Sequence, residues 1–177
     1  MKAIFLCLFF GLIVCGCRLQ KRPTLVSRYK ADKGIELAVP MIRGGSPHCG
    51  ACAAAMVLNF YGDDCLPTEF FSLIEKEEGI SNRALAATLR KRGYECYNLE
   101  GTKKQLAQLV QRQIPPILLL GAGKKYHYVV LTGFSRKGEL AALNNPFSGR
   151  EVVTVYELLA KWKASQNSLL VIAQKAD

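Results

Sequence analysis

The sequence predicts an α+β domain with a helical N-terminal half and an antiparallel sheet in its C-terminal half. The segment 49–61 is apolar on almost every side and dense in alanine, which is typical of a buried helix. Further helical segments follow before residue 113, whereas the segments after residue 117 are short apolar runs divided by turn residues. Helices first and strands second indicate an α+β arrangement.

Five helices and six strands are expected in chain order. Each helix after the first follows a Ser, Thr or Asn, whose side-chain oxygen caps the free N–H groups of the first turn. These caps are Thr68, Ser81 or Asn82, Thr102 and Thr154. The helices are expected over residues 49–61, 69–77, 82–92, 103–113 and 155–164. The strands are expected over residues 35–39, 94–99, 117–120, 126–134, 140–143 and 169–173.

The chain of 177 residues carries a formal net charge of +10, which first suggests nucleic acid or an anionic membrane surface as a partner. Much of the charge lies near the N-terminus, in Arg18, Lys21, Arg22, Arg28, Lys30 and Lys33. Neither a zinc-finger spacing nor a long basic helix accompanies it, so no nucleic-acid partner is expected. A basic segment beside a bilayer explains the N-terminal cluster.

The first residues predict an export signal, with Lys2 as its charged start and residues 3–14 as its apolar core. This segment is short of the roughly 20 residues that span a bilayer, although an uncleaved short anchor is the alternative. Val14-Cys15-Gly16-Cys17 resembles the lipobox of bacterial lipoproteins, in which Cys17 is lipidated and becomes the new N-terminus. Cys15 fits poorly because bulky Val14 would occupy a small-residue position. Arg18 in place of Asp implies the outer membrane, facing the periplasm.

The chain is therefore divided into a signal peptide (1–16), a basic tether (17–33) and one domain (34–177). Four cysteines remain in the domain, namely Cys49, Cys52, Cys65 and Cys96. Disulfides persist outside the cytosol, and four cysteines allow three pairings. A bridge between Cys65 and Cys96 is one possibility, whereas Cys52 lies inside the buried helix and should stay reduced.

Three residues carry candidate chemistry. Cys49 stands where a loop enters the buried helix, and the helix dipole there should lower its pKa; the alternative is a small buried hydrophobe. His127 opens the most convincing strand and could accept the thiol proton, or it could make a structural hydrogen bond. Asn145, in Asn144-Asn145-Pro146, could accept the Nδ1–H of His127, or it could simply mark a turn.

The order of this cysteine, histidine and asparagine resembles that of papain-like enzymes. Over residues 36–173 the chain resembles the bacteriocin-processing, double-glycine leader peptidases and their relatives. The segments that carry this resemblance are Val39-Pro40, Cys49-Gly50-Ala51, Ala55-Met56-Val57-Leu58, Tyr61-Gly62, His127-Tyr128-Val129-Val130-Leu131, Asn145-Pro146 and Trp162. The resemblance implies a papain-like fold and a thiol peptidase with Cys49, His127 and Asn145 as its triad.

Two departures from that family bear on catalysis. The relatives usually carry Asp where this chain has Asn145, and an amide orients imidazole but stabilises imidazolium less. They also carry a Gln five or six residues before the cysteine, which helps to bind the oxyanion; here those positions are Gly44 and Arg43. Arg43 could donate in place of that Gln, or it could be a solvated charge.

No cofactor and no metal are expected. The run 121–125 lacks the leading glycine and the closing Ser or Thr of a phosphate loop, and the Cys49–Cys52 pair lacks partners for zinc. The sequence thus predicts an exported, lipid-anchored cysteine peptidase that cuts a peptide or a secreted client protein in the envelope, with cleavage after Gly-Gly or Gly-Ala as one option. The alternative is a non-catalytic peptide-binding module that assists a secretion system. A Cys-His-His amidase would need a second histidine, and His48 is badly placed for that role.

Overall fold

The structure, a computed structural model, describes residues 23–32, 34–75, 79–123 and 125–174. The expected signal peptide, Cys17 and the first part of the expected tether lie outside these residues. Within the described part of the chain, no helix is long and apolar enough to cross a membrane.

The predicted antiparallel sheet is present, and it has seven strands among the described residues. The strands are β1 (Ile35–Glu36), β2 (Glu95–Glu100), β3 (Ile117–Ala122), β4 (Lys125–Phe134), β5 (Leu140–Asn145), β6 (Gly149–Thr154) and β7 (Ser168–Ala173). Their order is β2-β7-β3-β4-β5-β6, and β1 pairs with the end of β4. Central strands are apolar on both faces because helices cover both sides of the sheet.

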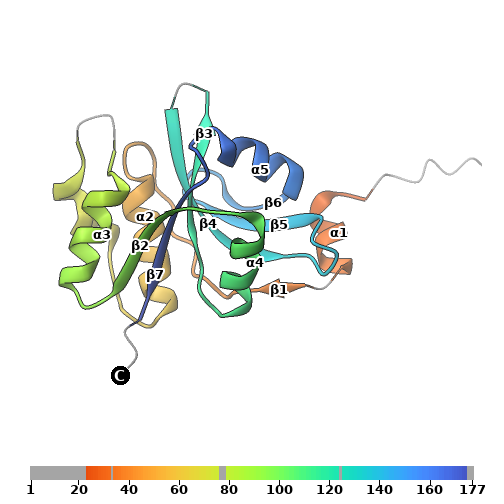
Figure 1. Ribbon diagram of the computed structural model, residues 1–177, viewed down its shortest axis with the longest axis horizontal. Coiled ribbons are helices and arrows are strands. Elements are labelled where there is room, and N and C mark those ends of the chain that lie inside the picture. Colours follow the sequence, from red (N-terminus) through yellow and green to blue (C-terminus); the bar gives the residue numbers. More distant parts are fainter. Residues whose placement is uncertain (1–22, 33, 76–78, 124, 175–177) are drawn as a thin grey trace, which may run out of the picture.

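The helices are α1 (Leu25–Ala31), α2 (Cys49–Phe60), the 3₁₀ helix η1 (Pro67–Leu73), α3 (Asn82–Lys91), α4 (Lys103–Gln111) and α5 (Val155–Lys163). In Figure 1, α2 and α3 lie toward one end of the sheet, and α5 and α1 lie toward the other. Residues 49–58 of α2 are all buried, as its all-round apolar sequence predicts. The α+β fold expected from the sequence is therefore confirmed.

The capping predictions are mostly confirmed. The side chains of Ser81, Thr102 and Thr154 each accept a hydrogen bond from a backbone N–H of the helix that they precede. The expected helix after Thr68 is wrong: Leu66 is the cap of a 3₁₀ helix, and Thr68 lies inside it. Pro67 sets the first position of this short helix, and the chain leaves it at Ile74 for a β-bridge between Glu75 and Gly79.

Two elements were not predicted. The strand β6 follows the Asn145-Pro146 turn and pairs with β5 along its whole length, with Asn145 opposite Gly149 and Leu140 opposite Thr154. Its mixed charged and apolar sequence is only half buried, so it lacks the apolar run of a central strand.

The second unpredicted element is α1, which lies in the segment expected to be a tether. Thr24 caps this helix, and Tyr29 is 5% exposed in a small cluster with Leu140 and Ala142. A helix that packs on the sheet therefore lies within the segment expected to be a tether, and Leu25 is among its packed residues. Tyr29 is the one buried residue of this helix. A single buried position produces no hydrophobic periodicity along the sequence from which a helix could be predicted.

The cysteines of the described chain are all free and buried, so the bridge suggested between Cys65 and Cys96 is absent. The Cys65 sulfur instead accepts a hydrogen bond from Arg92 Nη1 at 3.4 Å. Burial raises the pKa of both thiols to about 11. Cys52 is reduced, as expected.

Candidate active site

Cys49 is the first residue of α2 and is 8% exposed. Backbone N–H groups of Tyr128, Gly50 and Cys49 itself lie close enough to the sulfur to favour the thiolate. Desolvation outweighs them, and the pKa of the thiol is raised above its ordinary value. The lowered pKa expected from the helix dipole is therefore wrong, because the depth at which the sulfur is buried cannot be read from the sequence.

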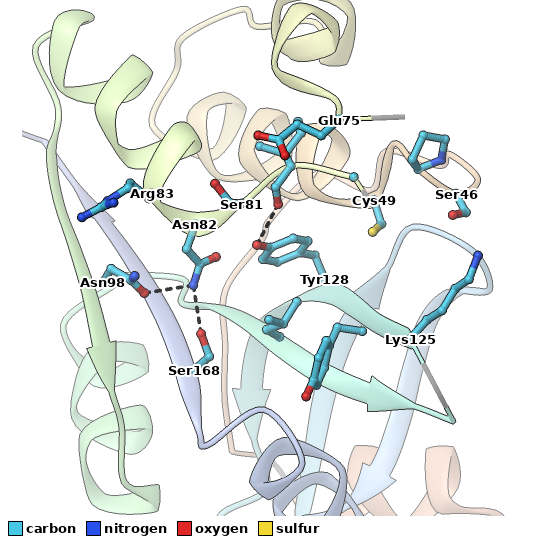
Figure 2. Close-up of a pocket in the computed structure, with 15 residues that line it drawn as sticks. Ser46, Cys49, Glu75, Ser81, Asn82, Arg83, Asn98, Lys125, Tyr128 and Ser168 are labelled. Carbon is cyan, nitrogen blue, oxygen red and sulfur yellow. Dashed lines mark hydrogen bonds between the residues drawn. The ribbon is translucent and has the colours of Figure 1, made fainter. Parts of the chain in front are cut away.

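The Cys49 side chain opens onto a cleft of about 820 Å³. Figure 2 shows Cys49 beside Ser46 at one end of this cleft, with Tyr128 next to it and the Asn82, Asn98 and Ser168 cluster at the other end. The Tyr128 hydroxyl donates to the Ile80 carbonyl at 3.0 Å. Such a cleft beside a thiol can hold an extended peptide segment.

The ring of Tyr128 packs directly on the first turn of α2. A Cβ at Gly50 would lie 3.1 Å from Tyr128 Cδ2, so a glycine at this position lets the helix start approach β4 closely. At the far end of the cleft, Asn82 Nδ2 donates to Asn98 Oδ1 and to Ser168 Oγ, both at 3.0 Å. The cleft thus has an apolar wall near the sulfur and a polar cluster away from it.

His127 lies near the start of β4 and is 7% exposed. Its Nε2 is 2.6 Å from Asn145 Oδ1, and its ring stacks on Phe147 with centroids 4.1 Å apart. The expected pairing of His127 with Asn145 is thus present in the structure. The expected nitrogen is wrong, because Asn145 contacts Nε2 and not Nδ1.

The hydrogen bonds of Asn145 fix the tautomer of His127. Asn145 Oδ1 also accepts from the Phe147 N–H at 3.0 Å, and Asn145 Nδ2 donates to Glu151 Oε1 at 3.3 Å. The amide oxygen therefore faces His127, so Nε2 carries a proton and donates it. A neutral imidazole with a protonated Nε2 has a free lone pair on Nδ1, which is what a general base needs.

The pKa of His127 is lowered, first by burial, although the Asn145 hydrogen bond and the Glu151 charge both oppose that shift. The imidazole is therefore neutral at neutral pH. Its Nδ1 has no hydrogen-bond partner among the described residues. That buried, unpaired acceptor is available for a proton.

Cys49 and His127 both lie near the start of β4. The pairing of β4 with β5 begins at Val130. The Cys49 sulfur lies at the backbone N–H of Tyr128, which precedes Val130 on β4 and follows His127 directly. The imidazole lies on the α5 side, beside a second cavity of about 270 Å³ that Asn145 and Phe147 also line. A direct thiol–imidazole hydrogen bond is not formed, because Nδ1 of His127 has no partner among the described residues.

Arg43, the candidate oxyanion donor, is exposed and extends over the start of β6. A Cβ at Gly149 would lie 2.6 Å from Arg43 Nη2, so the guanidinium rests on that glycine. The Arg43 carbonyl accepts a weak hydrogen bond from the Cys52 thiol at 3.8 Å. Its proposed part in oxyanion binding stays a prediction.

Two residues of this arrangement were missed from the sequence. Phe147 covers one face of the imidazole, and Glu151 holds the Asn145 amide. An aromatic residue two places after Asn145 was visible in the sequence, but Glu151 could be found only through the register of the unpredicted strand β6. No cluster of three or more metal-binding side chains occurs in the described ranges.

Comparisons with known proteins bear on the family and the fold of the chain. The model of the Peptidase C39 family matches residues 41–177. No curated protein sequence matches the chain significantly. Solved structures are also similar to the chain, at low identity, and therefore bear on the fold alone.

The first of these structures is a double glycine motif protease from an AMS/PCAT transporter in complex with the leader peptide. It is 21% identical to this chain with a TM-score of 0.67, and the match covers 79% of this chain and 94% of that one. The second is the peptidase domain of Streptococcus ComA, a bifunctional ABC transporter of a quorum-sensing pathway, with 16% identity, TM-score 0.66 and coverage of 80% and 99%. The third is a protein from Bacillus anthracis described as a C39-like peptidase, with 13% identity, TM-score 0.71 and coverage of 82% and 100%.

Proposed function

The chain belongs to the Peptidase C39 family, and on this premise we propose that it is a thiol peptidase with Cys49 as nucleophile and His127 as general base. One observation carries the proposal. The Cys49 sulfur lies at the backbone N–H of Tyr128, the residue that follows His127 on β4. The Nε2 of His127 is held by Asn145, and its Nδ1 is free to take a proton. This is the division of labour that an activated nucleophile requires.

In the proposed reaction the thiol proton passes to His127 Nδ1 and the sulfur attacks the carbonyl carbon of a peptide bond. The Cys49 backbone N–H, in the first turn of α2, donates to the oxyanion. The imidazolium then protonates the leaving amine, which departs as the thioester forms. Water, activated by His127, hydrolyses the thioester and restores the thiol.

The proposed substrate is a peptide or protein segment held extended in the cleft. Cleavage after Gly-Gly or Gly-Ala is the most specific form of this proposal. It is supported by the solved double glycine motif protease, whose structure contains a leader peptide.

The test is cleavage of synthetic peptides that contain Gly-Gly or Gly-Ala, followed by mass spectrometry of the products. We expect Cys49→Ala to lower kcat/KM by at least about 10³-fold, because no other group can form the thioester. Cys52→Ala is the matched control, since it removes a buried thiol of the same helix and should leave turnover within a few-fold of wild type.

A second candidate function is a non-catalytic module that binds a peptide for a secretion system. The raised pKa of the Cys49 thiol favours it, because the thiolate and not the thiol is the nucleophile. The same assay separates the two functions. A wild-type protein that binds a peptide but cleaves it no faster than Cys49→Ala would overturn the peptidase proposal.

The proposed location is the cell envelope, with the domain attached through a lipid on Cys17. The support is the sequence Val14-Cys15-Gly16-Cys17 and the preceding apolar segment, which resemble a lipoprotein signal. An extracytoplasmic site would give the peptidase access to exported peptides.

A further inference from the structure

Glu151 lies behind Asn145 on the same face of the sheet. In the β5–β6 pairing, Leu143 is opposite Glu151 and Asn145 is opposite Gly149, so Asn145 and Glu151 are diagonal neighbours. Glu151 Oε1 accepts from Asn145 Nδ2 at 3.3 Å and also accepts from the Ser148 hydroxyl. The carboxylate is therefore held on the side of the amide that faces away from His127.

This contact decides which way the Asn145 amide points. An asparagine side chain has an oxygen and an NH₂ group of similar shape, and the hydrogen-bond partners determine their places. Glu151 can only accept when ionised, so it selects the NH₂ group, while the Phe147 N–H selects the oxygen. With Glu151 removed, only one of these two restraints would remain.

The charge of Glu151 matters as well as its hydrogen bond. Asn145 is neutral, so by itself it offers the protonated imidazole no compensating charge. Glu151 lines the same cavity as His127, and its negative charge raises the pKa of His127 against the effect of burial. Stabilising imidazolium in this way lowers the cost of taking the thiol proton.

The other charged groups facing this cavity are Glu157 and Lys161 of α5. They form an ion pair with each other, with Lys161 Nζ 2.9 Å from Glu157 Oε1. Their charges largely cancel, whereas Glu151 is bonded to Asn145 and Ser148, which are both neutral. Among the groups that line the cavity, Glu151 is thus the negative charge without an ion-pair partner in the described part of the chain, and the structure also places a cation, the Arg43 guanidinium, over Gly149 on this face of β6.

We propose that Glu151 is a positioning residue for proton transfer, which acts through Asn145 to orient His127 and to stabilise its imidazolium form. The inference rests on the proposed peptidase function for the reaction that it serves. Glu151 itself takes no proton: the thiol proton moves to His127 Nδ1 and then to the leaving amine. The three side chains, His127, Asn145 and Glu151, lie in this order on the neighbouring strands β4, β5 and β6.

The test measures the pKa of His127 by NMR on histidine-labelled protein in the Cys49→Ala background, so it needs no turnover. We expect Glu151→Gln, which keeps an acceptor oxygen but removes the charge, to lower the His127 pKa by about one pH unit. His48, the other histidine of the sequence, serves as an internal reference. The control replaces both Glu157 and Lys161 by Gln, which leaves the net charge of the cavity unchanged and should leave the His127 pKa unchanged.

A charge swap tests the same inference in the active protein. In the double variant Asn145→Asp with Glu151→Gln, the carboxylate and the amide exchange places, so the negative charge and every donor–acceptor match are kept. We expect Glu151→Gln alone to lower kcat about tenfold with little change in KM, and the double variant to recover to within about threefold of wild type.

The two readouts separate the inference from the proposed function. If the pKa of His127 is the same in Glu151→Gln as in wild type, the proposed role of Glu151 is overturned, whether or not the protein cleaves peptides. Failure of the double variant to recover, in a protein that folds and binds peptide normally, would overturn it as well. If the pKa falls as expected but wild type never exceeds the Cys49→Ala blank, the positioning role holds and the peptidase proposal fails.

Discussion

At the scale of single residues, two opposing effects act on the Cys49 thiol. The start of α2 and the Tyr128 N–H favour the thiolate, and burial disfavours it more strongly. A thiol with a raised pKa reacts slowly at neutral pH, because the thiolate is the nucleophile. In the proposed mechanism, proton transfer to His127 is then a step of the reaction and not a state of the resting protein.

This balance predicts the pH dependence of Cys49 alkylation. Raising the pKa of an acid shifts its ionisation to higher pH, so the iodoacetamide rate of the folded protein should stay low at mildly acidic and neutral pH. It should rise above about pH 8.5, the ordinary thiol range. Labelling is followed by mass spectrometry, with denatured protein as the reference for an unshifted thiol. Fast labelling of folded Cys49 at pH 6 would show that the thiolate is already present.

Sequence reasoning found three of the site residues because their chemistry is local. Cys49 precedes an unusually apolar helix, His127 starts a strand, and Asn145 stands before a proline at a strand end. It could not reveal which ring nitrogen of His127 contacts Asn145, or that the Glu151 carboxylate contacts the Asn145 amide. Both depend on the lateral register of β4, β5 and β6, which no spacing along the chain encodes.

At the scale of secondary-structure elements, the predictions succeeded where the sequence contains the capping residue that marks the start of a helix. The helices α3, α4 and α5 each begin after a residue that caps the first turn. The helix α1 and the strand β6 were missed because each is short and only partly buried, so tertiary contacts decide its structure. They contact each other, and α1 also contacts β5.

The packing of α1 predicts that Tyr29 contributes to the stability of the domain. Tyr29 is 5% exposed, and its Oη lies against Gly133, where a Cβ would be 2.5 Å away. We expect Tyr29→Ala to lower the free energy of unfolding by about 2–3 kcal/mol, because it leaves a cavity between α1 and the sheet. Urea denaturation of the domain measures this change.

Two variants act as controls for Tyr29→Ala. The Tyr29 hydroxyl is buried without a hydrogen-bond partner among the described residues, so Tyr29→Phe should leave the stability unchanged or slightly higher. Val26→Ala lies in the same helix at 48% exposure and should have little effect. Equal stability of wild type and Tyr29→Ala would show that α1 does not belong to the folded domain.

At the scale of the whole molecule, the position of α1 shortens the segment that could link the domain to a bilayer. A tether over residues 17–33 would reach at most about 55 Å when fully extended, whereas residues 17–23 reach only about 20 Å. A domain anchored through Cys17 would therefore stay close to the membrane surface. Its basic N-terminal residues would then lie where anionic lipid headgroups attract them.

This arrangement predicts the behaviour of two cysteine variants of the full-length precursor. Cys17→Ala removes the thiol that would receive the lipid, so we expect an unprocessed precursor with altered mass. Cys15→Ala is the matched control, because it changes the neighbouring cysteine of the same segment and should leave processing intact. Both are measured by membrane fractionation and by mass spectrometry of the intact protein. A Cys17→Ala protein that is processed, has the mass expected for a lipid-bearing chain and fractionates like wild type would contradict the lipid anchor, while the predictions for Cys49, Glu151 and Tyr29 would stand, since each rests on residues of the folded domain.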